Sequence, residues 1–436
     1  MLQGPDILVV VLDTLRQDRV GSYGYERDTT PVLDGLAARG TRYTEARSTS
    51  SWTSPAHASM LTGLHPAAHG ATQEKWDLEL AQTTLPEILV PHGYRAIAGI
   101  GNPMLANARG YGQGFEAYYE AWRARKPWEG ASGGLTTDEA TLRWLVEQTS
   151  ARDERPQFVF VNVIGIHTPY DSCLESCGRY GAALDGGLVD NQWQEVYLGR
   201  VTHSEADLKR LSDLYDAEVR EADAFLGKIV AAFEAAAGDR PRLVIVTSDH
   251  GENLGDHGHI DHVFTLYESV VDVPLVAVGE GFAAGAVDPS PVQVHDVFAT
   301  VLRAAGATAA SQSLPLDEVP DDRTVLLDYH EPVQATRVLL GKATPEEKAR
   351  LAVYQRHLRS IVEGGTKLIE AEDGLREVYE LPSDPSERAN VSPAHPELDA
   401  VLKARFAEIA RATATGETPA VDPETQEALQ ALGYLE

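Results

Sequence analysis

A fifteen-residue stretch, Ser248 to His262, contains four histidines and four acidic residues in the sequence SDHGENLGDHGHIDH. Imidazole and carboxylate groups together suit a divalent metal ion such as zinc or manganese. A solvated acidic loop with incidental histidines is the alternative interpretation. A metal site also needs ligands from elsewhere, so the metal hypothesis requires further side chains from other segments of the chain.

Two predicted strands bring such side chains to one place. The run 243–247 (LVIVT) is apolar and β-branched, which is typical of a buried strand, and Asp249 and His250 follow it. The run 6–12 (DILVVVL) predicts a second buried strand that ends at Asp13. Ligand sites in open α/β sheets lie at the carboxyl ends of strands. We therefore expect Asp13 to meet Asp249 and His250, although a helix cap is the alternative for Asp13.

A hydroxyl group stands at the start of a predicted helix. The segment 48–55 (STSSWTSP) leads into the helix-like sequence AHASMLTG, and Thr53 lies near the junction. The free N–H groups and the dipole of a helix N-terminus bind an anionic ester and lower the cost of forming an alkoxide. Thr53 is therefore a candidate nucleophile, with an ordinary N-cap as the alternative.

Ordered segments along most of the chain resemble the sulfatase-like branch of the alkaline phosphatase superfamily. The matching segments are ILVVVLDTLRQDRVGSYGY, TTPVLDGLAARGTRYTEA, TSPAHASMLTGLHPAAHG, HTPY, YDAEVREAD, TSDHGENLGDHG, TLYESVVDVPL and VYELPSDPSERANV. The resemblance implies an α/β fold with a mixed, mainly parallel central sheet sandwiched by helices and a small C-terminal antiparallel subdomain. It also implies a hydrolase that acts on small anionic esters.

The same resemblance implies roles for individual residues. One divalent metal, with zinc or manganese favoured and calcium as the alternative, would be held by Asp13, Asp249, His250 and Thr53, and Thr53 would be the nucleophile. A single metal is expected because two-metal relatives carry an Asp at the position of Val163. The expected roles of the other histidines are general acid for His257 in the GDHG turn and anion binding for His57, His167 and His262.

The chain departs from true sulfatases at the nucleophile. Those enzymes carry Cys or Ser in a Cys/Ser-x-Pro-x-Arg pattern and oxidise it to formylglycine, whereas this chain has TSPAH at 53–57. Thr53 cannot become formylglycine because its β-carbon carries a methyl group. A second departure is Thr14, where many sulfatases have another ligand Asp. Thr nucleophiles occur in related phosphodiesterases and phosphoethanolamine transferases, so we expect hydrolysis of phosphate or phosphonate esters through a phospho-threonine.

Three alternatives to this function stay open. A transferase would pass the phosphoryl group to an alcohol instead of water. A sulfatase could work with Thr53 as nucleophile and without formylglycine. A catalytically silent binding protein is the most remote of the three, because it would have retained a whole set of residues without using them: Asp13, Thr53, Asp249, His250 and His257.

Composition limits the classes of binding partner and the cellular compartment that we expect. A formal net charge of −29 over 436 residues argues against nucleic acid and anionic membranes as partners. There is no transmembrane run, and the N-terminus lacks a basic region and a cleavage site, so we expect a cytoplasmic protein. The two cysteines, Cys173 and Cys177, are expected to be free thiols, with a short disulfide as the alternative.

The predicted organisation is a catalytic α/β domain at 1–310, a small antiparallel sheet at 325–392 and a helical tail at 393–436. A long helix is expected from Glu205 to Ala236, with its acidic residues on a solvated face. The segments around 102–135 and 171–200 are expected to set specificity. His330, near the start of the small sheet, is less favoured as a residue of the cleft.

Overall fold

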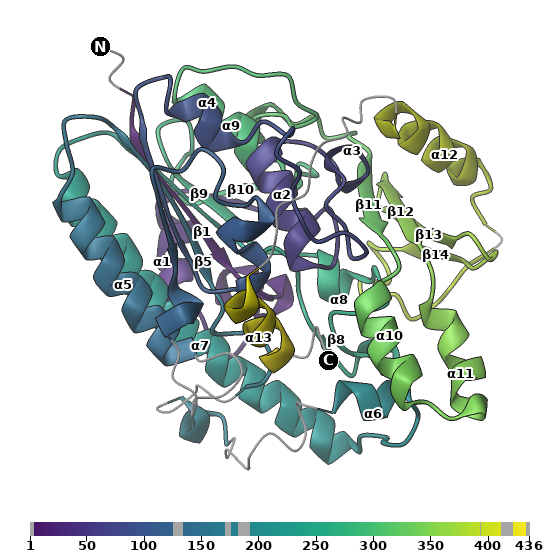
Figure 1. Cartoon of the computed structure of the whole chain (residues 1–436). Helices are drawn as coiled ribbons and strands as arrows, with labels where there is room; N and C mark the ends of the chain where they lie inside the picture. Colours follow the sequence, from purple (N-terminus) through teal and green to yellow (C-terminus); the bar gives the residue numbers. More distant parts are fainter. Residues whose placement is uncertain are drawn as a thin grey trace.

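An eight-stranded mixed sheet forms the centre of the main body in the computed structural model (Figure 1), with the strand order β10-β2-β9-β6-β1-β5-β3-β4. The neighbours β6, β1, β5, β3 and β4 run parallel. Strand β9 is antiparallel to both β6 and β2, so the expected mixed, mainly parallel sheet is confirmed. The structure describes residues 4–124, 134–170, 176–181, 192–392, 394–410 and 422–432.

The central strands are buried on both faces, as their continuous apolar runs predict. Side chains at alternate positions of β1 enter two different cores, with Leu8 and Val10 on one face and Val9 and Val11 on the other. The strands of this sheet are β1 (Asp6–Leu12), β2 (Thr41–Tyr43), β3 (Arg95–Ile100), β4 (Ala117–Glu120), β5 (Gln157–Val163), β6 (Arg242–Thr247), β9 (Leu275–Gly279) and β10 (Ala286–Asp288).

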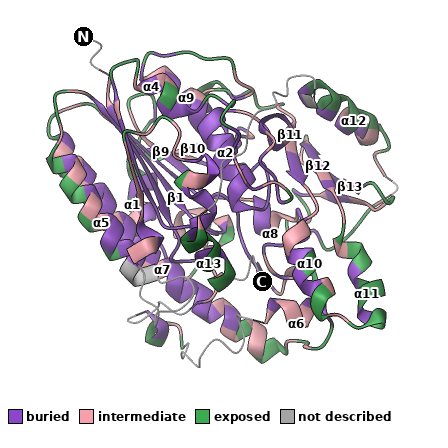
Figure 2. Ribbon diagram, in the orientation of Figure 1, coloured by how far each residue is buried: buried purple, intermediate pink, exposed green. Residues whose placement is uncertain are grey.

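Helices cover both faces of the sheet (Figure 1). One face is covered by α1 (Pro31–Arg39), α5 (Gly134–Ser150) and α7 (Glu205–Ala237). The other is covered by α2 (Thr53–Thr62), α4 (Leu85–Leu89) and α9 (Asp296–Ala304). Figure 2 shows that α2 is buried along its length, whereas α5 exposes its outer side. Shorter helices are α3 (Pro66–His69), α6 (Trp193–Tyr197) and α8 (Glu268–Val271).

Several acidic residues of α7 are buried instead of lying on the solvated face that we expected. Asp216 is fully buried and pairs with Arg19 and Arg27 at 3.2 and 2.7 Å. Asp223 is also buried, and its carboxylate accepts hydrogen bonds from the first backbone N–H groups of α1 at Val32 and Leu33. These carboxylates therefore fix the N-terminal segments of the fold instead of solvating a surface.

A second sheet follows the main body, with the order β11-β12-β13-β14 and antiparallel pairing throughout. Three of its strands were expected, and β11 adds a fourth. Their bounds are β11 (Val325–Tyr329), β12 (Leu358–Glu363), β13 (Thr366–Ala371) and β14 (Arg376–Glu380). Helices α10 (Val333–Lys342) and α11 (Pro345–Leu351) lie between β11 and β12 in the chain.

The C-terminal helices pack in two different places. Helix α12 (Glu397–Ala410) covers the small sheet through Leu402 and Phe406. Helix α13 (Pro423–Ala431) returns to the main body, where Ala428 packs against Trp122 (Figure 1). The predicted helical tail therefore packs in two parts, with α12 on the small sheet and α13 on the main body.

Two further expectations have an outcome in the structure. Cys177 is disulfide-bonded, which corrects the expectation of two free thiols, and Cys173 lies outside the described residues. Among the described helices, none combines the length and the apolar composition that a membrane span requires.

Candidate active site

The carboxyl ends of β1, β5 and β6 bring the predicted metal ligands together. Parallel register places Leu12 beside Val163 and Val11 beside Thr247, so the three strands end at nearly the same level. Asp13 follows β1, and Asp249 with His250 follows β6. The side chains of all three are 0% exposed, so their chemistry takes place away from bulk water.

Asp13, Asp249 and His250 offer ligand atoms that all lie within 4.8 Å of one another. Asp13 Oδ1 and Asp249 Oδ2 are buried and form no hydrogen bond. His250 Nδ1–H donates to the carbonyl of Gly251 at 2.9 Å, which leaves Nε2 with its lone pair 3.3 Å from Asp249 Oδ2. Two carboxylate oxygens and one imidazole nitrogen are a donor set for a divalent cation.

The electrostatics of this group also fit a cation. Burial, together with the neighbouring charge of Asp13, raises the pKa of Asp249 well above its ordinary value. Burial and the nearby His262 lower the pKa of His250 well below its ordinary value, so its imidazole is neutral. Among the described residues, no Lys or Arg pairs with either carboxylate. Unpaired buried carboxylates are costly, and a divalent cation bound between them would remove that cost.

Two asparagines orient the first carboxylate. Asn102 and Asn162 donate from Nδ2 to Asp13 Oδ2 at 2.9 and 3.0 Å, which leaves Oδ1 for a metal. Asn162 Oδ1 in turn accepts from the backbone N–H of Asn102 at 2.9 Å. Sequence reasoning did not single out either residue, although an amide in the otherwise apolar strand β5 was a usable signal.

Thr53 is the first residue of α2 and is fully buried. Its hydroxyl donates to His250 Nε2 at 3.2 Å, and Asn102 Nδ2 approaches the hydroxyl oxygen at 3.5 Å. The predicted nucleophile therefore lies directly beside the predicted metal ligands. Its backbone position at the N-terminus of α2 adds the positive end of the helix dipole.

His57 lies behind the metal ligands, one turn into α2. Its Nδ1–H donates to the carbonyl of Thr53 at 3.0 Å and lies 3.5 Å from Asp249 Oδ2. Its Nε2 accepts from Asn162 at 3.3 Å. Burial lowers the pKa of His57 to about 4, so the ring is neutral. Both nitrogens of His57 therefore have hydrogen-bonding partners within the protein.

His262 carries the positive charge of the site. Its Nδ1 lies 3.0 Å from Asp261 Oδ1 and 3.3 Å from Glu252 Oε1. Burial alone would lower the pKa of His262, but these two carboxylates raise it well above its ordinary value. Its ring centroid lies 4.4 Å from that of His250 and 5.1 Å from that of His167. A buried imidazolium beside the metal group is suited to an anionic substrate; its partners Glu252 and Asp261 were missed from sequence.

His167 follows β5 and joins the same group, as expected. It is 1% exposed, and its Nδ1–H donates to the carbonyl of Thr168 at 2.7 Å. Burial and the positive charge of His262 lower the pKa of His167, so a neutral ring stands beside a charged one.

His257 does not join this group. It is exposed in a short 3-10 turn, Asp256–Gly258, and its ring stacks on Tyr267 at 3.8 Å between centroids. It lines a surface cavity of 440 Å³ together with Arg16 and Arg388. Within the described residues no contact joins it to Thr53. The GDHG turn points its imidazole toward the small sheet, so the geometry does not support His257 as general acid.

A known protein family and several known proteins are similar to this chain. A family model described as Sulfatase matches residues 5–307. A protein named Sulfatase from Formosa agariphila is 22% identical over 437 residues, which cover 88% of this chain and 82% of that protein.

Solved structures of similar fold include members of two enzyme classes. A candidate sulfatase from Bacteroides thetaiotaomicron has a TM-score of 0.70 at 18% identity and covers 97% of this chain and 96% of that one. The phosphonate monoester hydrolase of Agrobacterium radiobacter has a TM-score of 0.69 at 20% identity and covers 94% of this chain and 95% of that one.

Proposed function

The chain belongs to the sulfatase family of ester hydrolases, and on that premise we propose that it hydrolyses phosphate or phosphonate esters with Thr53 as nucleophile. One observation carries this proposal: the Thr53 hydroxyl lies 3.2 Å from His250 Nε2, within the group formed by Asp13, Asp249 and His250. A hydroxyl so placed lies beside the side chains that would hold a divalent cation, and that cation would lower the pKa of the hydroxyl and attract an anionic ester.

A divalent cation, zinc or manganese in preference to calcium, would be held by Asp13, Asp249, His250 and Thr53. When bound, it would lower the pKa of the Thr53 hydroxyl and neutralise charge on the ester. One cation is proposed in this group, because Val163 supplies no carboxylate beside His167.

The chain's own residues account for the remaining steps. Thr53 Oγ1 releases its proton to solvent and attacks phosphorus, and the bond between phosphorus and the leaving oxygen breaks. His262 binds the anionic oxygens and supplies the proton that the leaving alkoxide takes, while His167 holds a further oxygen. Water then attacks the phosphorus of the phospho-threonine and gives a proton back to His262, while the bond to Thr53 Oγ1 breaks. Thr53 Oγ1 takes up a proton from solvent, and phosphate or phosphonate is released.

Sulfate ester hydrolysis is the second candidate, and the matched family and the named relative favour it. Position 53 argues against it. Formylglycine hydrate has a second oxygen on its β-carbon and can release sulfate by collapsing to an aldehyde. Thr53 has one such oxygen, so its ester must be cleared by water at the central atom. Phosphoryl groups suit this route, because positioning and charge neutralisation supply most of their catalysis.

Trapping the intermediate tests the proposal. The enzyme is mixed with a nitrophenyl phosphate or phosphonate, quenched in acid within one turnover and digested for mass spectrometry. We expect a phosphoryl group on the peptide that contains Thr53, and none in Thr53→Ala. A label on another residue, or turnover that survives in Thr53→Ala, would exclude Thr53 as nucleophile. An alcohol acceptor that is required for turnover would favour a transferase.

A further inference from the structure

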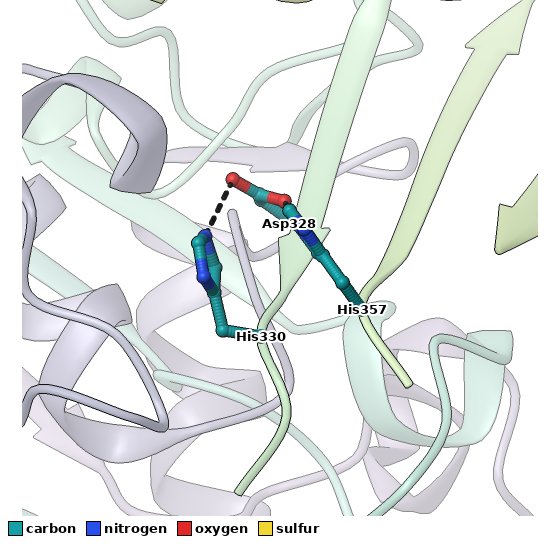
Figure 3. A group of neighbouring side chains, drawn as sticks. All are labelled: Asp328, His330 and His357. Atoms are coloured by element: carbon teal, nitrogen blue, oxygen red, sulfur yellow. Dashed lines mark hydrogen bonds and ion pairs between the residues drawn. The ribbon is translucent and has the colours of Figure 1, made fainter. Parts of the chain in front are cut away.

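A second group of metal-ligating side chains lies in the small sheet and has no part in the proposed reaction. It consists of Asp328 on β11, His330 just after β11 and His357 just before β12 (Figure 3). In the antiparallel register Asp328 faces Arg359 and Tyr329 faces Leu358. Continuing that register places His330 beside His357, on the same face as Asp328 because side chains alternate along a strand.

The two imidazoles point toward one carboxylate (Figure 3). His357 Nε2 lies 2.5 Å from Asp328 Oδ1, and His330 Nε2 lies 3.4 Å from Asp328 Oδ2. The two rings are stacked with centroids 4.1 Å apart. The three ligand atoms lie within 4.8 Å of one another. They therefore converge closely enough to share one ion after small side-chain rotations.

Two buried atoms of this group lack a hydrogen-bonding partner. Asp328 is fully buried, yet its Oδ2 forms no hydrogen bond, and neither does His330 Nε2, which faces it. The two atoms face each other at 3.4 Å, the contact drawn in Figure 3, and a buried carboxylate oxygen without a hydrogen bond is costly. A cation between Asp328 Oδ2 and His330 Nε2 would coordinate both atoms at once, whereas no hydrogen bond forms between them in the present geometry.

The surroundings hold the ligands in place from the main body. The backbone N–H of Asp328 donates to the carbonyl of Thr49 at 3.0 Å, and Ser50 Oγ donates to the carbonyl of Asp328 at 2.6 Å. The backbone N–H of His330 donates to Gln73 Oε1 at 2.9 Å. Side chains of His330 and His357 are 27% and 16% exposed, so an ion can reach them from solvent.

The guanidinium of Arg359 lies close to Asp328, with Nε 3.7 Å from Oδ1. Its side chain is 42% exposed, and its guanidinium already lies over the ring of Phe406 at 4.4 Å. It can therefore stay on that ring when a metal binds. Two nitrogen donors and one carboxylate favour zinc-type ions over magnesium or calcium, which prefer oxygen ligands.

We propose that Asp328, His330 and His357 bind a zinc-type divalent cation, in addition to and independently of the ion beside Thr53. The site joins β11 and β12 to the segment 49–50, which leads into the helix of Thr53. Its occupancy stabilises the small sheet on the main body.

Zinc titration of the full chain tests this site. The Asp249→Asn variant removes a ligand of the proposed metal site beside Thr53. Calorimetric titration of this variant with zinc ion alone then measures binding at the remaining sites. We expect one zinc per chain, and an affinity that falls by about a hundredfold or more when His357→Ala is added. His92→Ala, which removes an exposed imidazole of the main body, is the matched control and should leave the affinity unchanged.

A second variant and a second measurement distinguish loss of zinc binding from loss of folding. His330→Ala should weaken zinc binding as His357→Ala does, and zinc should raise the thermal midpoint of Asp249→Asn but not of the double variants. Circular dichroism shows whether each variant is folded. A folded Asp249→Asn chain that binds no zinc, or an affinity unchanged by both histidine variants, would overturn the proposal and leave Asp328 as a plain ion-pair partner of two imidazolium groups.

Discussion

The cluster formed by His262 with Asp261 and Glu252 shows how single residues set the charge of the proposed site. The two carboxylates keep His262 positively charged in a location where burial alone would neutralise it. His167 and His250, in contact range of the same ring, stay neutral for the opposite reason. One cationic and two neutral imidazoles thus lie side by side. The cationic ring can bind an anion or donate a proton, whereas a neutral ring can accept a proton or bind a metal.

Removing His262 should damage catalysis far more than removing His257. We expect His262→Ala to lower kcat/KM by about a hundredfold or more, with the larger loss on esters of poor leaving groups, because general acids contribute in this range. His257→Ala should change kcat/KM by less than about threefold on any ester, since its ring stacks on Tyr267 outside the group. Matched nitrophenyl and alkyl esters measure both effects. A large, leaving-group-dependent loss in His257→Ala would restore His257 as general acid.

The sequence was informative where a side chain follows a strand directly. Asp13, Asp249 and His250 were expected at one edge because each follows an apolar run, and the structure brings them together. Asn102 was not expected, because its partner Asp13 lies far away in the chain. Glu252 was not singled out, although its partner His262 lies in the same short segment. His257 was assigned from its turn, which says nothing about the direction in which the ring points.

At the scale of elements, one buried lysine joins the small sheet to the main body. Lys367 on β13 is 0% exposed, and its Nζ lies 2.8 Å from a carboxylate oxygen of Glu268 and 2.8 Å from one of Glu387. Glu268 belongs to α8 of the main body and also pairs with Arg47 at 2.8 Å. Burial alone would raise the pKa of Glu268, but these cations lower it to about 2, so the carboxylate stays charged.

Breaking this link should destabilise the protein strongly. Lys367→Met leaves two buried carboxylates with one cation fewer, and we expect a loss of about 3–5 kcal/mol in the free energy of unfolding. Lys403→Met is the control, because that side chain is 70% exposed and its pair with Glu370 should contribute less than about 1 kcal/mol. Urea unfolding of both variants measures the difference. Equal, small losses would mean that the buried link does not hold the sheets together.

Periodicity and composition were sufficient for most elements. The central strands, the helix that begins at Thr53 and the antiparallel small sheet were expected close to their observed bounds. The acidic residues of α7 were misjudged because their partners, Arg19, Arg27 and the start of α1, lie about 190 residues away. A charged residue looks solvated in sequence unless its long-range partner is known.

At the scale of the whole molecule, buried neutral histidines make stability depend on pH. Burial lowers the pKa of His65 and His295 to about 4 and that of His69 to about 3. The unfolded chain protonates these rings near their ordinary pKa of about 6.5, whereas the folded chain does not. Their contribution is therefore complete above about pH 6.5 and is lost as the pH falls toward the lowered values.

A variant of one such ring should flatten this dependence. His69 accepts from the backbone N–H of Ala71 and bonds Ser59, so the folded site requires a neutral imidazole. We expect His69→Gln to reduce the slope of unfolding free energy between pH 6 and 4.5 by about 1.4 kcal/mol per pH unit. Urea titrations at several pH values measure the slope, with the exposed His92→Gln as control. An unchanged slope in His69→Gln would show that this ring is protonated in the folded state.

The choice between phosphoryl and sulfuryl transfer is the central claim, and relative rates on matched esters test it most directly. Nitrophenyl phosphate, phosphonate and sulfate share one leaving group, so differences in kcat/KM report on the transferred group. We predict that the phosphate or phosphonate ester outpaces the sulfate by about a hundredfold or more, equivalent to about 2.7 kcal/mol in barrier. Thr53→Ala gives the background rate and should remove the activity. A sulfate ester that is hydrolysed faster, with that turnover abolished by Thr53→Ala, would contradict the phosphoryl assignment.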